Sequence, residues 1–440
     1  MCKCGRSEML INDHNSCMVQ FRIGKYKMHA LKNWEHVVPD LIVYKFSMEL
    51  DQRSSGPHVL IFPLPLQSHV TTTLNFAELL CLANFHITFL NSHFVHNRLL
   101  RHIDIQSHFA IPDFVSTASP TRNGDFCSIG LGLLACVVAD GIMNFATDIA
   151  KEIGLMSISF RTISASCYWS YFGIPKLIEA SELPFKESEM DILITSVPGM
   201  EDILLRRDLP GFCRTSNVAA DKTLQFVIRQ SQGNVRADSL IVNTFEELEA
   251  PALYHIRDHI PNTYAIGSLH THLSSRLASI KGTAPIASNS LWEEDRSCMA
   301  WLDAQPPKSV LHVSFGSITV MTRDELMEIW YGLVWFLWVM RPDSVVGDGG
   351  EGQAPEELLA GTRERGYMVG WAPPEEVLKH QAIGGFWTEW LVSEVWKLGF
   401  DMKDRCDRVI LEKMIRDLMG ERKVEFMKSA TEMADWQEQV

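Results

Sequence analysis

Two polar side chains, His69 and Asp140, stand where a parallel sheet would place catalytic groups. His69 follows an apolar run at residues 58–62 and a short loop, and Asp140 ends a second apolar run at 134–139. Ligands of an open parallel sheet bind beyond the carboxyl ends of its strands. A histidine that bonds a buried carboxylate is a suitable general base, because the carboxylate fixes the tautomer and stabilises the imidazolium. The pattern predicts such a pair. The alternative is that His69 and Asp140 are two unrelated polar residues at loop starts, since the chain has 16 histidines.

A phosphate could bind at the turn of Gly316 and Ser317, which follows an apolar strand pattern at 310–315. Free N–H groups near the start of the next helix attract anions. An ordinary turn explains the residues equally well. The spacing does not fit a dinucleotide or Walker fingerprint, which disfavours a nucleotide-dependent oxidoreductase.

Trp371 lies between the strand-like segment at 367–370 and a helix signal at 374–380. Its indole could stack on a nucleobase or simply pack between two elements. Gly384 and Gly385 lie in a predicted strand, where they either allow a close backbone approach or form a bulge.

Metal ligation is not expected. The sequence has no D-x-D pair, which weakens the case for a metal-held diphosphate. A solvated helix face explains three aspartates at helical spacing better than a metal site does. A loose extension explains four N-terminal cysteine and histidine residues better than a zinc site does. These two sets are Asp401, Asp404 and Asp407, and Cys2, Cys4, His14 and Cys17.

The order of elements predicts two α/β lobes. Strand and helix patterns alternate from Pro57 onwards, which indicates a doubly wound parallel sheet, and a second such unit begins near Trp292. We predict a poorly ordered extension at 1–56, an N-terminal lobe at 57–269, a linker at 270–291 and a C-terminal lobe at 292–440.

The C-terminal lobe carries one clear helix start. Thr322 and Glu325 form a capping box before a helix whose apolar face includes Leu326, Ile329, Trp330 and Leu333. This helix runs into the strand pattern at 335–340 with hardly any loop, so residues are expected to be missing between Val334 and Trp335. In the N-terminal lobe, the turn-rich segment 198–213 is expected to be a surface loop.

Composition excludes several classes of protein. With 46% hydrophobic and 21% charged residues the 440-residue chain is expected to fold, and it is long enough for two domains. A net charge of -14 argues against nucleic-acid binding. The ten cysteines form no C-x-x-C pair, and no stretch is apolar enough to span a bilayer, so we expect a cytoplasmic protein.

Several motifs in order resemble the plant family-1 UDP-glycosyltransferases. They are HVLIFPLPLQSH, CVVADGIMNFATDIA, NTFEELE, WLDAQPPKSVLHVSFGS and WAPPEEVLKHQAIGGFWT. Two further segments, PGMEDILLRRDLPGFCR and SEVWKLGFDMKDRCDR, resemble glucosyltransferases of the iridoid type. The match covers nearly all of residues 57–434.

The resemblance implies a GT-B fold, with two Rossmann-like lobes facing a cleft, and an inverting, metal-independent transfer of glucose from UDP-glucose to a small acceptor. UDP-glucose would be the donor substrate, with no cofactor. By resemblance, His69 is the base and Asp140 the acid that orients it. The sugar donor would be contacted by Thr162, Ser317, Trp371 and Ala372.

The donor signature then departs from the family pattern. After GGFWT the family has a His-Cys-Gly-Trp-Asn-Ser helix start that holds the diphosphate, and later an Asp-Gln pair that grips the sugar. This chain passes from Trp390 directly to LVSEVWKLGF, which resembles a downstream segment. The C-terminal lobe is therefore predicted to be incomplete and transfer to be impaired. The alternative is a non-catalytic homologue or gene-model product that at most binds acceptor.

Overall fold

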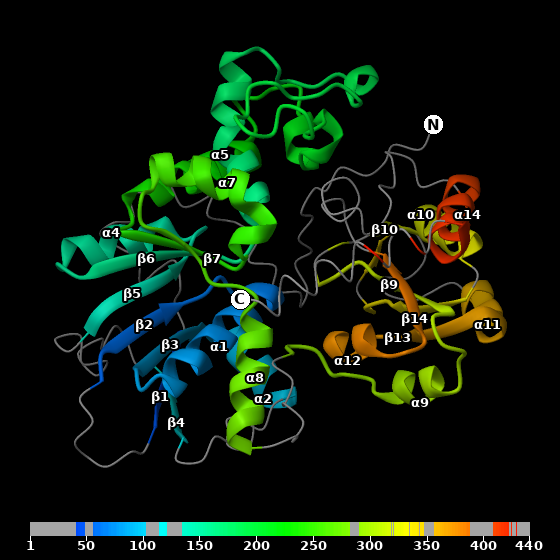
Figure 1. The fold of residues 1–440 in the computed structure, drawn as a ribbon, viewed down its shortest axis with the longest axis horizontal. Coiled ribbons are helices and arrows are strands. Elements are labelled where there is room, and N and C mark those ends of the chain that lie inside the picture. The colour runs from blue at the N-terminus through cyan, green and yellow to red at the C-terminus, as the bar shows by residue number, and fades with distance from the viewer. Residues whose placement is uncertain are drawn as a thin grey trace.

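Two sheets, each belonging to a separate α/β lobe, organise the chain in a computed structural model (Figure 1). The structure describes residues 41–48, 56–102, 114–120, 134–281, 290–317, 319, 321–333, 335–342, 344–346, 356–387, 408–421, 424 and 428. This arrangement confirms the prediction of two α/β lobes.

The N-terminal lobe has an eight-stranded sheet in the order β4-β1-β3-β2-β5-β6-β7-β8. Its strands are β1 (Leu41–Met48), β2 (His58–Phe62), β3 (His86–Ser92), β4 (Phe114–Pro120), β5 (Leu134–Asp140), β6 (Met156–Arg161), β7 (Ser239–Val242) and β8 (Thr263–Ala265). From β3 to β8 all neighbours are parallel, whereas β1 runs antiparallel to both β3 and β4. Parallel strands covered on both faces read as continuous apolar runs, which explains why the sequence revealed them.

Helices and short 3₁₀ turns complete this lobe. The helices are α1 (Gln67–Leu82), α2 (His93–His102), α4 (Asn144–Glu152), α5 (Ala165–Glu179), α6 (Lys222–Gly233), α7 (Glu246–His259) and α8 (Leu269–Lys281). The 3₁₀ turns are η5 (Glu187–Glu189), η6 (Arg206–Asp208), η7 (Gly211–Arg214) and η8 (Asn234–Arg236). The largest buried cluster of this lobe lies between α5, α7 and the segment that follows α5.

The C-terminal lobe has a four-stranded parallel sheet in the order β13-β11-β9-β14 and a small β10-β12 pair. Its strands are β9 (Val310–Ser314), β10 (Met321–Thr322), β11 (Phe336–Val339), β12 (Val345–Val346), β13 (Gly366–Val369) and β14 (Ile383–Trp387). Its helices are α9 (Ser297–Asp303), α10 (Arg323–Gly332), α11 (Glu356–Arg365), α12 (Pro374–Lys379), α14 (Arg408–Arg416) and the π-helical turn η9 (Asp417–Glu421).

The helix start predicted at Thr322 is confirmed. The Thr322 hydroxyl accepts from the Glu325 N–H, the Glu325 carboxylate accepts from the Thr322 N–H, and all four predicted apolar positions of the α10 segment are buried. The connection to β11 consists of residues 333–335, of which Val334 lies outside the described residues. Both elements form despite this short connection, and β11 pairs with β9 and β13.

Three predictions about segment structure need correction. Part of the 1–56 extension, residues 41–48, forms β1 rather than a disordered segment, because a run rich in β-branched and aromatic residues pairs with two strands. Residues 1–40 lie outside the described part. The first part of the predicted linker, residues 270–281, belongs to α8, whose Leu273 and Leu277 pack against Leu79 and Leu82 of α1. Residues 282–289 are not described.

The third correction concerns segment 198–213, which is more than a surface loop. It contains η6 and η7, and it buries four apolar side chains in the N-terminal core, namely Met200, Leu204, Leu209 and Cys213. Turn-forming residues dominate the sequence here and obscure the buried ones.

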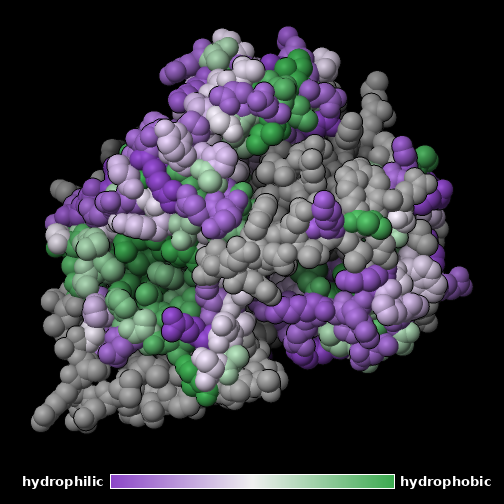
Figure 2. Space-filling model, in the orientation of Figure 1, coloured by the Kyte–Doolittle hydropathy of each residue, from purple (hydrophilic) through white to green (hydrophobic). Residues whose placement is uncertain are grey.

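The visible surface differs between the lobes. Hydrophobic residues gather over the N-terminal sheet, whereas hydrophilic residues predominate among the coloured residues of the C-terminal lobe (Figure 2). Among the described residues, no helix has both the length and the apolar character needed to cross a membrane.

Candidate active site

The structure brings His69 and Asp140 together. His69 lies in the first turn of α1 and Asp140 is the last residue of β5, the neighbour of β2 in the sheet. The distance from His69 Nδ1 to Asp140 Oδ2 is 2.5 Å. The His69 side chain is 12% exposed and the Asp140 side chain 1% exposed. The carboxylate is therefore sealed from water behind the imidazole.

Several interactions hold Asp140 ionised. Its Oδ1 accepts a hydrogen bond from the Ile142 N–H at 3.0 Å, and its Oδ2 accepts a longer one from the Leu64 N–H at 3.4 Å. Burial by itself raises the pKa of Asp140, but attraction and hydrogen bonding by His69, the Ile142 bond and the charge of Arg161 together bring the pKa below its ordinary value. An ionised Asp140 accepts a hydrogen bond from the Nδ1–H group of His69.

This tautomer leaves Nε2 of His69 as the basic nitrogen. Among the described residues, Nε2 makes no hydrogen bond, so it is available to an incoming hydroxyl. Thr162 also reaches the ring, with its Oγ1 3.0 Å from His69 Nδ1. Thr162 stands between β6 and α5, so it belongs to the same carboxyl edge of the sheet.

Glu249 of the NTFEELE motif organises the start of α5. It is 3% exposed, and its carboxylate accepts from the N–H groups of Ala165 and Ser166, both at 2.8 Å. Ser164 caps the same helix by accepting from the Cys167 N–H. A carboxylate is favourable at a helix N-terminus. Glu249 is not among the predicted site residues. The sequence signal that was available is Pro251, which lies two residues after Glu249 and accompanies the break in α7 at Glu249.

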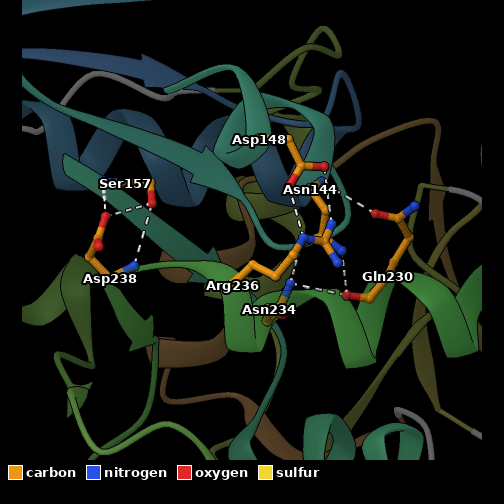
Figure 3. A network of polar contacts seen from close by, with 7 residues as sticks. All are labelled: Asn144, Asp148, Ser157, Gln230, Asn234, Arg236 and Asp238. Carbon is orange, nitrogen blue, oxygen red and sulfur yellow. Dashed lines mark hydrogen bonds and ion pairs between the residues drawn. The ribbon is translucent and has the colours of Figure 1, made fainter. Parts of the chain in front are cut away.

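A buried amide network holds the turn that follows Asp140 (Figure 3). The side-chain amide of Asn234 donates to Gly141 O and to Asn144 Oδ1, both at 2.7 Å, and Asn144 donates to Gln230 O at 2.7 Å. Nearby, Arg236 pairs with Asp148 of α4 at 2.8 Å. The network ties α4, α6 and η8 to the edge that carries Asp140.

The predicted phosphate turn lies in the other lobe. Ser317 follows β9, and Gly316 has a φ of +68°, a conformation that glycine adopts readily. The buried Arg341 donates to the carbonyl groups of Gly316 and Thr319. Arg341 therefore fixes the shape of this turn, although it is not among the predicted site residues.

Trp371 and Ala372 also lie in the C-terminal lobe, between β13 and α12. The Trp371 ring stacks on Trp292 with a centroid distance of 5.9 Å and an interplanar angle of 22°. Its buried Nε1 has no hydrogen-bond partner among the described residues, and Ala372 is 3% exposed. The packing interpretation of Trp371 is therefore correct for one face of the indole, and the nucleobase role stays a prediction.

The other sequence candidates have different outcomes. Gly384 shows both predicted properties, because the register of β14 shifts between Ile383 and Gly385 and an added Cβ on Gly384 would lie 2.3 Å from Lys308 O. The three aspartates at 401–407 and the N-terminal cysteine and histidine set lie outside the described residues. Within the described part, no cluster of three or more potential metal ligands occurs.

Comparison with known structures places the two-lobed fold among GT-B glycosyltransferases. Os79 from O. sativa in complex with UDP aligns with a TM-score of 0.63 and 22% identity, over 85% of this chain and 94% of that one. UGT71G1 from Medicago truncatula complexed with UDP-glucose aligns with a TM-score of 0.63 and 20% identity, over 87% and 94%.

Sequence comparison identifies the family. No family model matches the chain. The 7-deoxyloganetic acid glucosyltransferase of Catharanthus roseus is 46% identical over 454 positions, which cover 88% of this chain and 94% of that enzyme. The chain therefore belongs to the plant family-1 UDP-glycosyltransferases, and glycosyl transfer is its class of reaction.

Proposed function

We propose that this chain is built for transfer of glucose from UDP-glucose to a hydroxyl or carboxyl group of a small plant metabolite of the iridoid or terpenoid type. The observation that carries the proposal is the 2.5 Å contact between His69 and Asp140 at the edge of a parallel sheet. The 46% identity to a 7-deoxyloganetic acid glucosyltransferase supports the iridoid acceptor and the glucose donor.

In the proposed reaction, His69 Nε2 takes the proton of the acceptor hydroxyl as the acceptor oxygen attacks the anomeric carbon. The bond between that carbon and the UDP oxygen breaks, UDP leaves with the bonding electrons, and the configuration inverts. Asp140 stabilises the imidazolium that forms. Thr162, next to the base, would contact the sugar, and Ser317 with Trp371 and Ala372 would contact the diphosphate and the uracil.

We further propose that donor binding is impaired. The alignment with the Catharanthus roseus enzyme runs over 454 positions, whereas 88% of this 440-residue chain is about 387 residues. About 67 positions of the alignment thus have no residue of this chain, and they leave room for the absent family segment after Thr388. Each lost hydrogen bond to a charged diphosphate costs about 1.5–3 kcal/mol. Loss of several would weaken donor binding by orders of magnitude.

The second candidate is a non-catalytic homologue that binds acceptor alone. The departure from the family motif after GGFWT favours it, since the dyad lies in the N-terminal lobe and the segment after Thr388 belongs to the C-terminal lobe. Under this alternative the acceptor raises the melting temperature of the protein and UDP does not.

Both candidates are tested with purified protein, UDP-glucose and a panel of iridoid, terpenoid and phenolic acceptors. Glucoside formation is followed by mass spectrometry, and binding of UDP and of each acceptor by thermal shift. A repaired chain, with the corresponding segment of the Catharanthus roseus enzyme inserted after Thr388, is assayed beside it. The matched control is His69→Gln in the repaired chain.

We expect little or no transfer by the native chain and transfer to an iridoid acceptor by the repaired chain, abolished by His69→Gln. Turnover by the native chain equal to that of the repaired chain refutes the impairment. Transfer that survives His69→Gln refutes the assignment of the base. If the repaired chain binds UDP but glucosylates no acceptor, the proposed reaction is wrong.

A further inference from the structure

We propose that Trp292 is a positioning residue through which the N-terminal lobe sets the plane of the Trp371 indole. The inference rests on the role proposed above for Trp371, which is contact with the uracil of the donor. Trp292 is the first residue of the predicted C-terminal lobe, so it lies where the chain passes from one lobe to the other. It is not among the site residues predicted from the sequence.

The N-terminal lobe holds Trp292 through helix α2. The guanidinium carbon of Arg98, on α2, lies over the Trp292 ring at 4.2 Å from its centroid, which is within the range of a cation–π contact. Trp292 also packs against a buried cluster of this lobe to which α2 contributes, and the preceding Leu291 belongs to that cluster. The Leu291 N–H donates to Gln67 Oε1 of α1 at 2.7 Å. A charge, packing and a hydrogen bond one residue earlier thus attach the indole to the N-terminal lobe.

Trp371 is the contact of the same indole in the C-terminal lobe. The two rings stack with centroids 5.9 Å apart at an interplanar angle of 22°, which is an offset-stacked arrangement. The Trp371 carbonyl group accepts from the Asp295 N–H at 2.8 Å, which ties the Trp371 backbone to the segment that follows Trp292. The buried Nε1 of Trp371 has no hydrogen-bond partner in the described part of the chain. Because no such bond sets the plane of this ring, its orientation depends on packing, and Trp292 supplies the stacked face.

Arg341 links the same indole to the predicted phosphate turn. Its Cζ lies 5.8 Å from the centroid of the Trp292 ring, and its guanidinium donates to two carbonyl groups of the turn that carries Ser317. Trp292 therefore contacts, directly or through one side chain, both parts of the C-terminal lobe that are proposed to hold UDP. The contact with Arg98 makes their placement depend on the lobe that carries the candidate base.

A role confined to packing between the lobes predicts a different result. If Trp292 only stabilises the fold, its loss lowers the melting temperature and has no specific effect on UDP binding. Arg98 discriminates between the two roles, because it belongs to the N-terminal lobe, whereas every residue proposed to contact UDP belongs to the C-terminal lobe. A change in UDP affinity on replacing Arg98 therefore reports positioning.

The UDP affinity of Arg98 and Trp292 variants tests the inference. The Kd of UDP is measured by ligand-observed NMR, which also detects weak binding, in the native chain and in the repaired chain, at a temperature where each variant is folded. Trp292→Leu removes the stack, Arg98→Met removes the cation, and Arg98→Lys keeps a positive charge. Trp301→Leu is the matched control, because Trp301 stacks on Tyr367 at 5.5 Å and 21° within the C-terminal lobe.

We expect Trp292→Leu to raise the Kd of UDP by about tenfold, the upper range for an aromatic pair. Arg98→Met should raise it by about two- to fivefold, the size of an exposed cation–π contact. Arg98→Lys should stay within about twofold of the wild type, because an ammonium group can also bind the ring face. Trp301→Leu should leave the Kd unchanged even where it lowers the melting temperature.

An Arg98→Met variant that binds UDP as tightly as the wild type overturns the inference. A Trp301→Leu variant that loses as much affinity as Trp292→Leu also overturns it, since general damage to the lobe then explains both. If Trp292→Leu does not fold, the half-buried Arg98 and its two variants decide the question. Absence of UDP binding by both the native and the repaired chain refutes the proposed donor role of Trp371, whereas binding that is insensitive to Arg98 overturns the inference alone.

Discussion

Replacement of Glu249 by alanine tests how the edge of the sheet that carries Thr162 is built. The 3% exposed carboxylate accepts two N–H groups at the start of α5, both at 2.8 Å. Hydrogen bonds to charged groups contribute about 1.5–3 kcal/mol each. The substitution also relieves the desolvation of the buried carboxylate, so we take the lower end of the sum, about 3 kcal/mol. At about 2–4 °C per kcal/mol, the melting temperature should fall by roughly 6–12 °C.

The assay is thermal unfolding followed by circular dichroism at pH 7. Glu247→Ala is the matched control, because Glu247 is an exposed glutamate on the same helix. Glu249→Gln should fall between wild type and alanine, since the amide keeps one acceptor oxygen. If Glu249→Ala melts within about 2 °C of Glu247→Ala, a range expected for surface substitutions, the argument that these two bonds anchor α5 is wrong.

Three further outcomes are expected. In the repaired chain, His69→Gln should lower kcat by about 10²–10⁴-fold with the melting temperature little changed, and an unchanged kcat would exclude His69 as the base. The free energy by which ionised Asp140 stabilises the fold should persist above pH of about 4 and decline below it, because the folded-state pKa of Asp140 is lowered. The difference in unfolding free energy between wild type and Asp140→Asn, measured as a function of pH, reports this contribution, and a difference that grows on acidification would contradict the expectation. Gly141→Ala should destabilise the protein by about 1–3 kcal/mol in urea unfolding, because the added Cβ would lie 2.2 Å from Arg161 Cδ. In Gly370→Ala the added Cβ meets no atom within 4 Å, so this control should cost under about 0.5 kcal/mol, and equal costs would refute the packing argument.

Local signals predicted much of the fold. The apolar run at 134–139 and the Thr322 and Glu325 capping box each correspond to an observed element. The juxtaposition of His69 and Asp140 followed from the rule that parallel strands carry their ligands at the carboxyl edge. These predictions succeeded because the information lies within a few neighbouring residues or in a general property of the sheet.

Other elements depended on contacts that the sequence does not display. β1 becomes a strand only by pairing with β3 and β4, and α8 is stabilised by leucines of α1 that lie far away in the chain. Their own segments have weak periodicity, so local patterns gave a loose extension and a linker instead.

The sequence by itself determined the family, the two-lobed α/β fold and the residues of the candidate base pair, because ordered motifs and apolar periodicity are written along the chain. Only the tertiary structure decided what surrounds that pair. The turn after Asp140 is contacted by Arg161 and by Asn234, and the start of α5 is bound by Glu249. These partners are 20 to 93 positions apart in the sequence. A buried charge or amide has its effect through distance and exclusion of water, and both are fixed only when the strands and helices pack.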